Sequence, residues 1–535
     1  MKIVISAILL LVTAGLSLGQ DRYMVFFTDK AGSTYSVNDP AAFLSERSIS
    51  RRQRQAISIV ENDLPVNESY VEAVKNLGIE VYYRTKWMNG ILVQMDVAQL
   101  ASVEALGFVS SVEYVAPGAP LSPDSVEGAE ESEDSAIQPQ ATDFQNDMLG
   151  VREMNWDGFR GEGLLIGVFD EGFKGLSTLS SFQTLRDGRI TYTFDYTSNR
   201  EVVDNNINHG TQVLSILGAA SPDYGGIALE ADYILTITEA SGEYRVEEYY
   251  WLFSAEQADS AGVDIINTSL GYSLFDDPDM DYTLSNLDGQ TTVITQASNL
   301  AASKGIALVT SAGNTGLSLN WPRVTAPGDS PNVLTVGSVN SVLERARNSS
   351  TGPTADNRIK PDVVALGIAT AVIGDNDQPT FRSGTSFAAP IVTGLLAGLW
   401  ERYPDLTAAE VVELIRLSAS QYDTPDNELG YGIPKYTTAI GIAEEIDLPT
   451  VADLTAYPNP TVDGILTLAF NQEFFGEAVQ IAMVNAGGQR VDSFSLRPTE
   501  RDNRFPLNLS NHPAGIYLLR IAGVGGVITK KVIKY

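Results

Sequence analysis

Five apolar, β-branched runs between residues 142 and 445 constrain the fold of this chain most strongly. Separated by stretches of helical length, they read LLIGVF, DYILTI, VDIINTSL, GIALVTSA and NVLTVGSV. Their hydrophobicity is continuous rather than alternating, which predicts strands that are covered on both faces. We therefore expect an α/β domain over residues 142–445, with a mostly parallel sheet between helix layers. Functional side chains are expected just after the carboxyl ends of its strands.

Different patterns flank this region and predict a multidomain chain. Residues 20–116 combine short strands with helical stretches and are expected to form an α+β module. Residues 117–141 are rich in proline and acidic residues, a linker composition that cannot bury enough apolar surface to fold. Residues 446–535 return to short strands and turns, which predicts a small all-β sandwich.

The N-terminal segment predicts export. Lys2 precedes the apolar run IVISAILLLVTA, which is too short to span a membrane, and small residues stand before Gln20. Residues 1–19 are therefore expected to be a signal peptide, and no later segment predicts a stable membrane span.

Composition excludes several classes of function. The 67 acidic and 35 basic residues give a formal net charge of -32, which argues against a nucleic-acid or anionic-membrane partner. The chain has no cysteine, so disulfides, thiolate nucleophiles and Cys-ligated metal sites are excluded.

The segment SGTSFAAPIVTGLLAGLW, residues 383–400, predicts a serine nucleophile. Ser386 opens an apolar helix, Gly384 lets the backbone approach a substrate, and Pro390 lies near the helix start, where missing backbone donors are tolerated. A serine at the positive end of a buried helix is placed so that its own N–H can help bind an oxyanion. Ser386 is therefore the candidate nucleophile.

A hydroxyl nucleophile needs a base and a group that orients the base. Of the two histidines, His512 lies in the C-terminal β module, so His209 in NHGTQVLSILGA is the candidate base. Asp170 directly follows LLIGVF, where a carboxylate is placed to accept the second ring proton of the histidine. Taken singly, a histidine such as His209 is more often structural than catalytic, and an isolated aspartate such as Asp170 is more often a turn or cap residue.

Asn314, in GIALVTSAGNTG, is the candidate donor to the oxyanion. It again follows a predicted strand, and its amide can donate a hydrogen bond without titrating. The alternative is a turn asparagine beside Gly313.

Together these segments resemble the subtilase family, the subtilisin-like serine peptidases, over residues 145–445. The chain order Asp170, His209, Ser386 matches that family and differs from the order of α/β-hydrolases. NTSLGY (267–272), KPDVVALG (360–367) and GYGIPK (430–435) add to the resemblance. It implies that the substrate backbone pairs as an added strand with three residues, Ser269, Leu270 and Gly271.

Three departures from the family pattern stand out. Gln212 replaces a frequent second histidine, Leu366 replaces a usual proline, and Glu171 adds a carboxylate beside Asp170. Glu171 either perturbs the Asp170–His209 pair and shifts the pH dependence, or points into solvent. No cofactor is expected to be required and no metal ligand is identified, although calcium held by scattered oxygens would leave no motif.

The resemblance gives the N-terminal regions a role. The 20–116 module resembles a subtilase propeptide, which implies that it assists folding and caps the active cleft until it is removed. The linker 117–141 is then the expected maturation region. A basic cluster within the 20–116 module is either a processing site or a solvated helix face, and the second interpretation is preferred. Its members are Arg47, Arg51, Arg52 and Arg54.

The tail resembles the C-terminal sorting domain of type IX secretion cargo in Gram-negative bacteria of the Bacteroidetes group. The resemblance rests on AYPNP (456–460), the turn NAGGQRV and the strand GIYLLRI. It implies passage through an outer-membrane secretion machinery, followed by release or attachment at the cell surface. The alternative is a small sandwich that binds carbohydrate or protein.

The sequence thus predicts a secreted serine endopeptidase that cleaves protein or peptide substrates through an acyl-enzyme at Ser386, kept as a zymogen by its own propeptide. The alternative is a catalytically inactive subtilase scaffold that serves as a surface-binding protein. The presence of Asp170, His209, Asn314 and Ser386 together argues against it.

Overall fold

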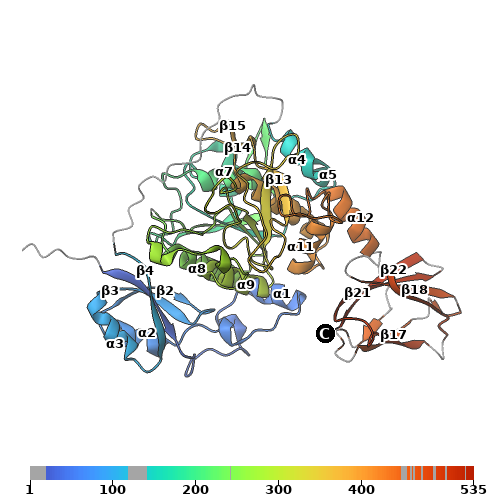
Figure 1. Ribbon diagram of the computed structural model, residues 1–535, viewed down its shortest axis with the longest axis horizontal. Coiled ribbons are helices and arrows are strands. Elements are labelled where there is room, and N and C mark those ends of the chain that lie inside the picture. The colour runs from blue at the N-terminus through green and yellow to red at the C-terminus, as the bar shows by residue number, and fades with distance from the viewer. Residues whose placement is uncertain are drawn as a thin grey trace, which may run out of the picture. The chain divides into compact units, whose positions relative to one another are not determined.

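A seven-stranded sheet in the order β13-β12-β11-β10-β5-β9-β6 forms the core of the larger compact unit of the computed structural model (Figure 1). All its strand pairs are parallel. Every residue of β5, β10, β11, β12 and β13 is buried, which confirms the prediction of strands covered on both faces. The strands are β5 (Leu165–Asp170), β6 (Ile190–Asp195), β9 (Asp232–Ile237), β10 (Ile265–Thr268), β11 (Ala307–Ser311), β12 (Leu334–Val339) and β13 (Val363–Leu366).

The structure describes residues 20–118, 141–240 and 242–446, together with parts of the C-terminal module. Those parts are 455–457, 459, 461, 464–470, 474–476, 478–485, 490–499, 503–523 and 526–534. The expected signal peptide and residues 119–140 of the expected linker lie outside the described residues. Among the described residues, no helix is both long and apolar enough to cross a membrane.

Helices cover the central sheet. α7 and α10 pack against each other, and α10 also contacts β10 to β13, whereas α8 and α9 pack together between the sheet and the N-terminal module (Figure 1). Nearly every side chain of α8 is buried, because this helix is covered on both sides. The helices of this region are α4 (Asp143–Leu149), α5 (Val151–Trp156), α6 (Gln183–Arg186), α7 (His209–Gly218), α8 (Val246–Ala261), α9 (Val293–Ser303), α10 (Thr385–Arg402) and α11 (Ala408–Leu417). Two short hairpins are β7 (Ala220–Ser221) with β8 (Tyr224–Gly225), and β14 (Thr370–Ile373) with β15 (Pro379–Arg382).

The N-terminal module is an antiparallel sheet in the order β2-β3-β1-β4, with helices packed on it, as expected for an α+β unit. Its own core contains Val25, Val71, Val93 and Val103. Its elements are β1 (Asp21–Phe27), α1 (Glu46–Arg54), α2 (Glu68–Lys75), β2 (Glu80–Thr85), β3 (Gly90–Met95), α3 (Leu100–Glu104) and β4 (Val109–Ala116).

Buried ion pairs join this module to α8. Asp259 on α8 accepts hydrogen bonds from Arg51 at 2.6 Å and from Arg52 at 2.8 Å, and the Nζ atom of Lys86 lies 3.3 Å from it. Arg51 and Arg52 are buried, so the preferred interpretation of the basic cluster as a solvated helix face is wrong for these two residues. Their charges are matched inside the interface instead.

The C-terminal region is a second compact unit of residues 417–419 and 435–535, distinct from the unit formed by residues up to Arg416 with 420–434. Two antiparallel sheets, β16-β17-β20 and β19-β18-β21-β22, enclose an apolar core, as expected for an all-β sandwich. Its elements are α12 (Tyr436–Ile446), β16 (Thr455–Tyr457), β17 (Ile465–Ala469), β18 (Val479–Asn485), β19 (Arg490–Leu496), β20 (Arg504–Asn508), β21 (Gly515–Gly523) and β22 (Gly526–Lys534).

Candidate active site

The candidate residues gather at the carboxyl end of the central sheet. Asp170 is the last residue of β5, and His209 is the first residue of α7. Ser386 is the second residue of α10, and Asn314 stands three residues beyond β11. Parallel strands place their carboxyl ends at one edge, which is how residues far apart in the chain come together.

His209 and Asp170 form a short hydrogen bond. The His209 Nδ1 atom lies 2.6 Å from Asp170 Oδ1, and the same carboxylate oxygen accepts from the Glu171 backbone N–H at 2.9 Å. Asp170 is fully buried, whereas the His209 side chain is 19% exposed. This bond holds the proton on Nδ1 and leaves Nε2 as the basic nitrogen.

The charges around His209 favour its protonated form. Burial by itself lowers the pKa of the imidazole, but the adjacent Asp170 carboxylate, helped by Glu171 and Glu239, outweighs burial and raises the pKa of His209 to about 9. Burial raises the pKa of Glu171 itself. Glu171 is half-buried, and its negative charge is one of those that raise the pKa of His209, which agrees with the interpretation in which Glu171 perturbs the histidine.

Ser386 is buried at the start of α10, with 8% of its surface exposed. Gly384 precedes it as the N-cap with φ 153°, a backbone conformation that favours glycine. The Ser386 hydroxyl donates to the Ser269 carbonyl at 3.3 Å, and no hydrogen bond joins it to His209 in the described part of the chain. The His209 ring nevertheless lies beside the ring of Phe387, with centroids 5.6 Å apart, so the two helix starts are adjacent.

The Ser386 carbonyl has an unusual partner. Pro390 stands four residues further along α10 and has no N–H, so it cannot donate the helical hydrogen bond to that carbonyl. The Ser269 hydroxyl donates to it instead at 2.9 Å. Asn267 donates to the Ser269 hydroxyl oxygen at 3.2 Å. Sequence reasoning missed this role of the Ser269 side chain. The four-residue spacing from Ser386 to Pro390 could have indicated it, because it predicts that the Ser386 carbonyl lacks a helical donor.

The Asn314 amide is oriented by the first residue of α10. Its Oδ1 atom accepts from the Thr385 N–H at 2.9 Å and from the Thr385 hydroxyl at 3.1 Å. A Cβ atom placed on Gly384 would lie 3.4 Å from Asn314 Nδ2, so the amide nitrogen lies beside the glycine that precedes the serine turn. Asn314 can therefore donate toward a group bound next to Ser386.

The segment Ser269–Gly271 continues the line of β10 beyond its last residue. Ser269 and Leu270 are buried, and a Cβ atom on Gly271 would lie 2.1 Å from the Thr325 hydroxyl, which excludes a side chain there. Tyr272 then bridges Ala326 in antiparallel fashion. The segment thus leads from the end of β10 to this bridge, and its first residue, Ser269, is hydrogen-bonded to Ser386.

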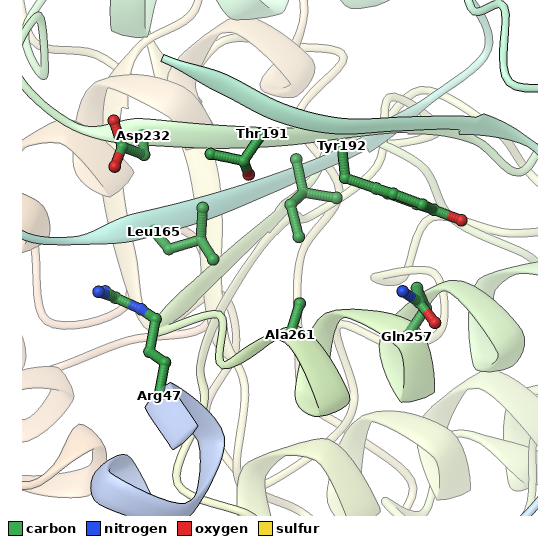
Figure 2. A pocket seen from close by; sticks show the side chains of 8 residues that line it. Arg47, Leu165, Thr191, Tyr192, Asp232, Gln257 and Ala261 are labelled. Atoms are coloured by element: carbon green, nitrogen blue, oxygen red, sulfur yellow. The ribbon is translucent and has the colours of Figure 1, made fainter. Parts of the chain in front are cut away.

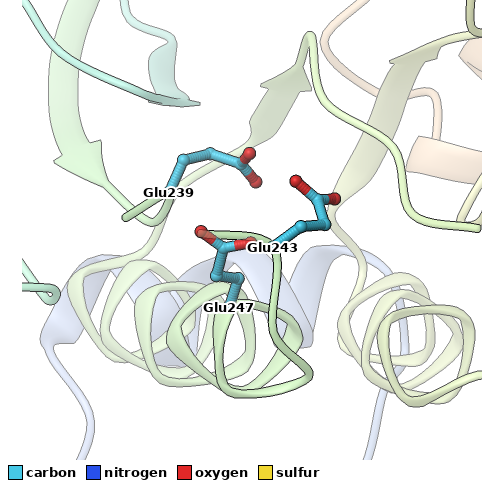
Figure 3. Close-up of side chains that lie close together, drawn as sticks. All are labelled: Glu239, Glu243 and Glu247. Atoms are coloured by element: carbon cyan, nitrogen blue, oxygen red, sulfur yellow. The ribbon is translucent and has the colours of Figure 1, made fainter. Parts of the chain in front are cut away.

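Two other features differ in their position relative to these residues. A cavity of about 360 Å³ is lined by Arg47, Leu165 and Asp232, among others (Figure 2). Leu165 and Asp232 are the first residues of β5 and β9, so this cavity is at the opposite end of the strands from Asp170 and is not a substrate cleft for Ser386. Nearer the site, the carboxylates of Glu239, Glu243 and Glu247 converge (Figure 3).

Comparison with protein families divides the chain into three matched regions. Residues 161–432 match the subtilase family, residues 22–132 match the peptidase S8 propeptide domain of Bacteroidota, and residues 455–535 match the secretion system C-terminal sorting domain.

Individual relatives agree with these matches. The chain is 27% identical to subtilisin DY of Bacillus licheniformis over 284 residues, which are 52% of this chain and 91% of that protein. It is 30% identical to subtilisin E of Bacillus subtilis over 217 residues, 40% of this chain but only 51% of that protein. The crystal structure of the epidermin leader peptide processing serine protease of Staphylococcus aureus is similar in fold, with a TM-score of 0.56 and 15% identity. That similarity covers 79% of this chain and 99% of the other.

Proposed function

Because the chain belongs to the subtilase family of serine endopeptidases, we propose that it cleaves proteins with Ser386 as nucleophile, His209 as general base and Asp170 as the residue that orients the base. The observation that carries this assignment is the 2.6 Å bond between His209 Nδ1 and Asp170 Oδ1. It fixes the tautomer that leaves Nε2 basic, at a helix start adjacent to the one that holds Ser386.

The reaction begins when the Ser386 hydroxyl leaves the Ser269 carbonyl and gives its proton to His209 Nε2. The serine oxygen attacks the peptide carbonyl carbon, and His209 then protonates the departing amine. The negative oxygen of the tetrahedral intermediate accepts hydrogen bonds from Asn314 Nδ2 and from the Ser386 N–H, which has no helical partner at this position. Water activated by His209 hydrolyses the acyl-enzyme, and the proton returns to Ser386.

Substrate binding is assigned to Ser269, Leu270 and Gly271. An extended peptide that pairs with this segment would bring its scissile carbonyl to Ser386 through main-chain hydrogen bonds, which select loops and unfolded segments rather than folded domains. Support comes from Gly271, whose missing side chain keeps the backbone close to Thr325.

The flanking regions place this activity in an exported zymogen. The sorting domain and the Bacteroidota propeptide indicate a secreted or cell-surface protein of a Gram-negative bacterium. We propose that an outer-membrane secretion machinery recognises the tail. We also propose that the propeptide is released by cleavage between residues 117 and 141. No cofactor is assigned to the hydrolytic step, since His209 carries out the proton transfers and Asp170 orients it.

Hydrolysis of a denatured protein tests this function. A foreign protease site placed between residues 117 and 141 would allow each variant to be matured without self-cleavage. The matured wild type should degrade denatured casein, and Ser386→Ala should lose this activity. Ser383→Ala, which alters a serine on the preceding turn, is the matched control and should retain it. Equal rates for wild type and Ser386→Ala would refute the assignment, and a folded, inactive wild type would favour the surface-binding scaffold.

A further inference from the structure

Three carboxylates converge beside the candidate active site (Figure 3). Glu239 lies two residues beyond β9, Glu243 lies in the following loop, and Glu247 is the second residue of α8. One carboxylate oxygen from each lies within 4.8 Å of the others. The connection from β9 to α8 thus directs three carboxyl groups at one point.

Within the described part of the chain, no lysine or arginine forms an ion pair with any of the three glutamates. Arg245, close in sequence, is paired with Glu113 instead. Ionised carboxylates only accept hydrogen bonds, so with all three ionised the arrangement is electrostatically unfavourable unless a positive group enters it.

Glu247 gives the most specific sign of a ligand. Its side chain is fully buried, and its Oε1 atom accepts from the Ala240 N–H at 2.6 Å. Its Oε2 atom is also buried and has no hydrogen-bond partner in the described part of the chain. The Glu247 carboxylate points toward the other two carboxylates (Figure 3). A buried carboxylate oxygen without a partner is costly, and a bound cation would remove that cost.

We propose that Glu239, Glu243 and Glu247 bind a divalent cation, and that its chemistry is that of calcium. Calcium takes six to eight oxygen ligands in a flexible geometry, so it can accept three protein carboxylates at once. Magnesium keeps several of its waters and is usually held by one or two carboxylates. A group of three converging carboxylates therefore suits calcium better than magnesium. A single guanidinium or ammonium would leave two of the three negative charges unmatched.

The electrostatics of the glutamates agree with this site. Burial, with Asp276 adding to it, raises the pKa of Glu243 to about 7. Burial also raises the pKa of both Glu239 and Glu247 well above the usual carboxyl range. A bound cation would act in the opposite direction, because it favours the ionised carboxylates.

The site would tie together segments that matter for the neighbouring site. The Tyr272 hydroxyl donates to Glu239 Oε1, and Tyr272 directly follows Gly271. The ion would thus connect the exit of β9 and the first turn of α8, and through Tyr272 it would reach the end of the extended segment. Its existence does not depend on the proposed hydrolytic function.

Terbium luminescence tests the site directly, since Tb³⁺ replaces calcium and is sensitised by a nearby tyrosine. The probe is the metal-stripped full chain carrying Ser386→Ala, titrated with Tb³⁺ and then with Ca²⁺ as competitor. We expect saturable luminescence that Ca²⁺ displaces, and a higher unfolding temperature in Ca²⁺. Glu243→Gln and Glu247→Gln should each weaken this binding about tenfold or more. Glu162→Gln, which alters an exposed glutamate, should leave it unchanged.

Two outcomes would overturn the proposal. In the first, both glutamine variants bind Tb³⁺ and Ca²⁺ as the parent does, which would place any bound ion elsewhere. In the second, the glutamine variants again bind Ca²⁺ normally, and a peptide library cleaved by the matured, active enzyme shows a different effect. The enzyme prefers lysine or arginine in its substrates, and Glu243→Gln abolishes this preference. That result would assign the group to a basic substrate side chain. The stability of both variants toward denaturant is compared with that of Glu162→Gln. A variant that is as stable as Glu162→Gln but binds Tb³⁺ more weakly has lost binding and not folding.

Discussion

The Ser269 hydroxyl donates a 2.9 Å hydrogen bond to the main-chain carbonyl of Ser386, the carbonyl that Pro390 leaves without a helical donor. The side chain of Ser269, in the proposed substrate-binding segment, therefore holds the turn that presents the proposed nucleophile. Because both residues are buried, this bond couples the two parts of the site rigidly.

Ser269→Ala should destabilise the full chain by about 1–3 kcal/mol, because the buried Ser386 carbonyl would lose its donor. Thermal unfolding in the Ser386→Ala background measures this without self-cleavage. Pro390→Ala restores a backbone N–H that can donate to the same carbonyl, so the Ser269→Ala change should cost less in that background. Equal costs in the two backgrounds would show that the bond contributes nothing.

The pH dependence of hydrolysis should follow His209. A general base acts in its neutral form, so kcat/KM should rise with pH as the imidazole loses its proton, with a midpoint near the pKa of about 9. Glu171→Gln removes one of the negative charges that raise this pKa, so the rising limb should move to lower pH. Glu162→Gln, on an exposed turn, should leave the limb unchanged. A limb that does not move in Glu171→Gln would contradict the electrostatic account of His209.

Asn314→Ala should lower kcat by about 10²–10³-fold and change KM little, because the amide is proposed to donate only to the oxyanion. Steady-state kinetics on a peptide substrate measure both constants. Since Asn314 also accepts from Thr385, unfolding of the variant should be followed in parallel. A loss confined to KM would instead indicate a role in substrate binding.

Asp259→Asn should loosen the N-terminal module from α8. The change leaves Arg51 and Arg52 buried beside a neutral group, and breaking a buried pair costs about 3–5 kcal/mol. The exposed pair of Arg84 with Glu68 gives the comparison, since Glu68→Gln should cost less than about 1 kcal/mol. Thermal unfolding of the full chain carrying Ser386→Ala checks both, and equal effects of the two variants would refute the role of burial.

Much of the fold could be predicted from local pattern. Continuous apolar runs became buried parallel strands, and Asp170 and Asn314 were found because both directly follow such runs. The roles of these residues stay predictions until the variants are measured. The fate of Arg51 could not be predicted, because its partner Asp259 lies 208 residues away in sequence. A basic cluster by itself is equally compatible with a solvated surface.

The glutamate group illustrates a different limit. Glu239, Glu243 and Glu247 are spaced four residues apart, which is typical of one helix face, yet only Glu247 lies in a helix. The convergence arises from a loop that folds back onto the first turn of α8. The Ser386 hydroxyl likewise points to the Ser269 carbonyl, a rotamer choice that no sequence pattern encodes.

Covalent labelling with a fluorophosphonate tests the Asp170, His209 and Ser386 assignment most directly. The matured protein should take up one label, and peptide mass spectrometry should find it on Ser386. The label should disappear in Ser386→Ala and form far more slowly in His209→Ala, because the base is needed to activate the hydroxyl. A label that persists in Ser386→Ala, or a folded wild type that takes up none, would contradict the assignment.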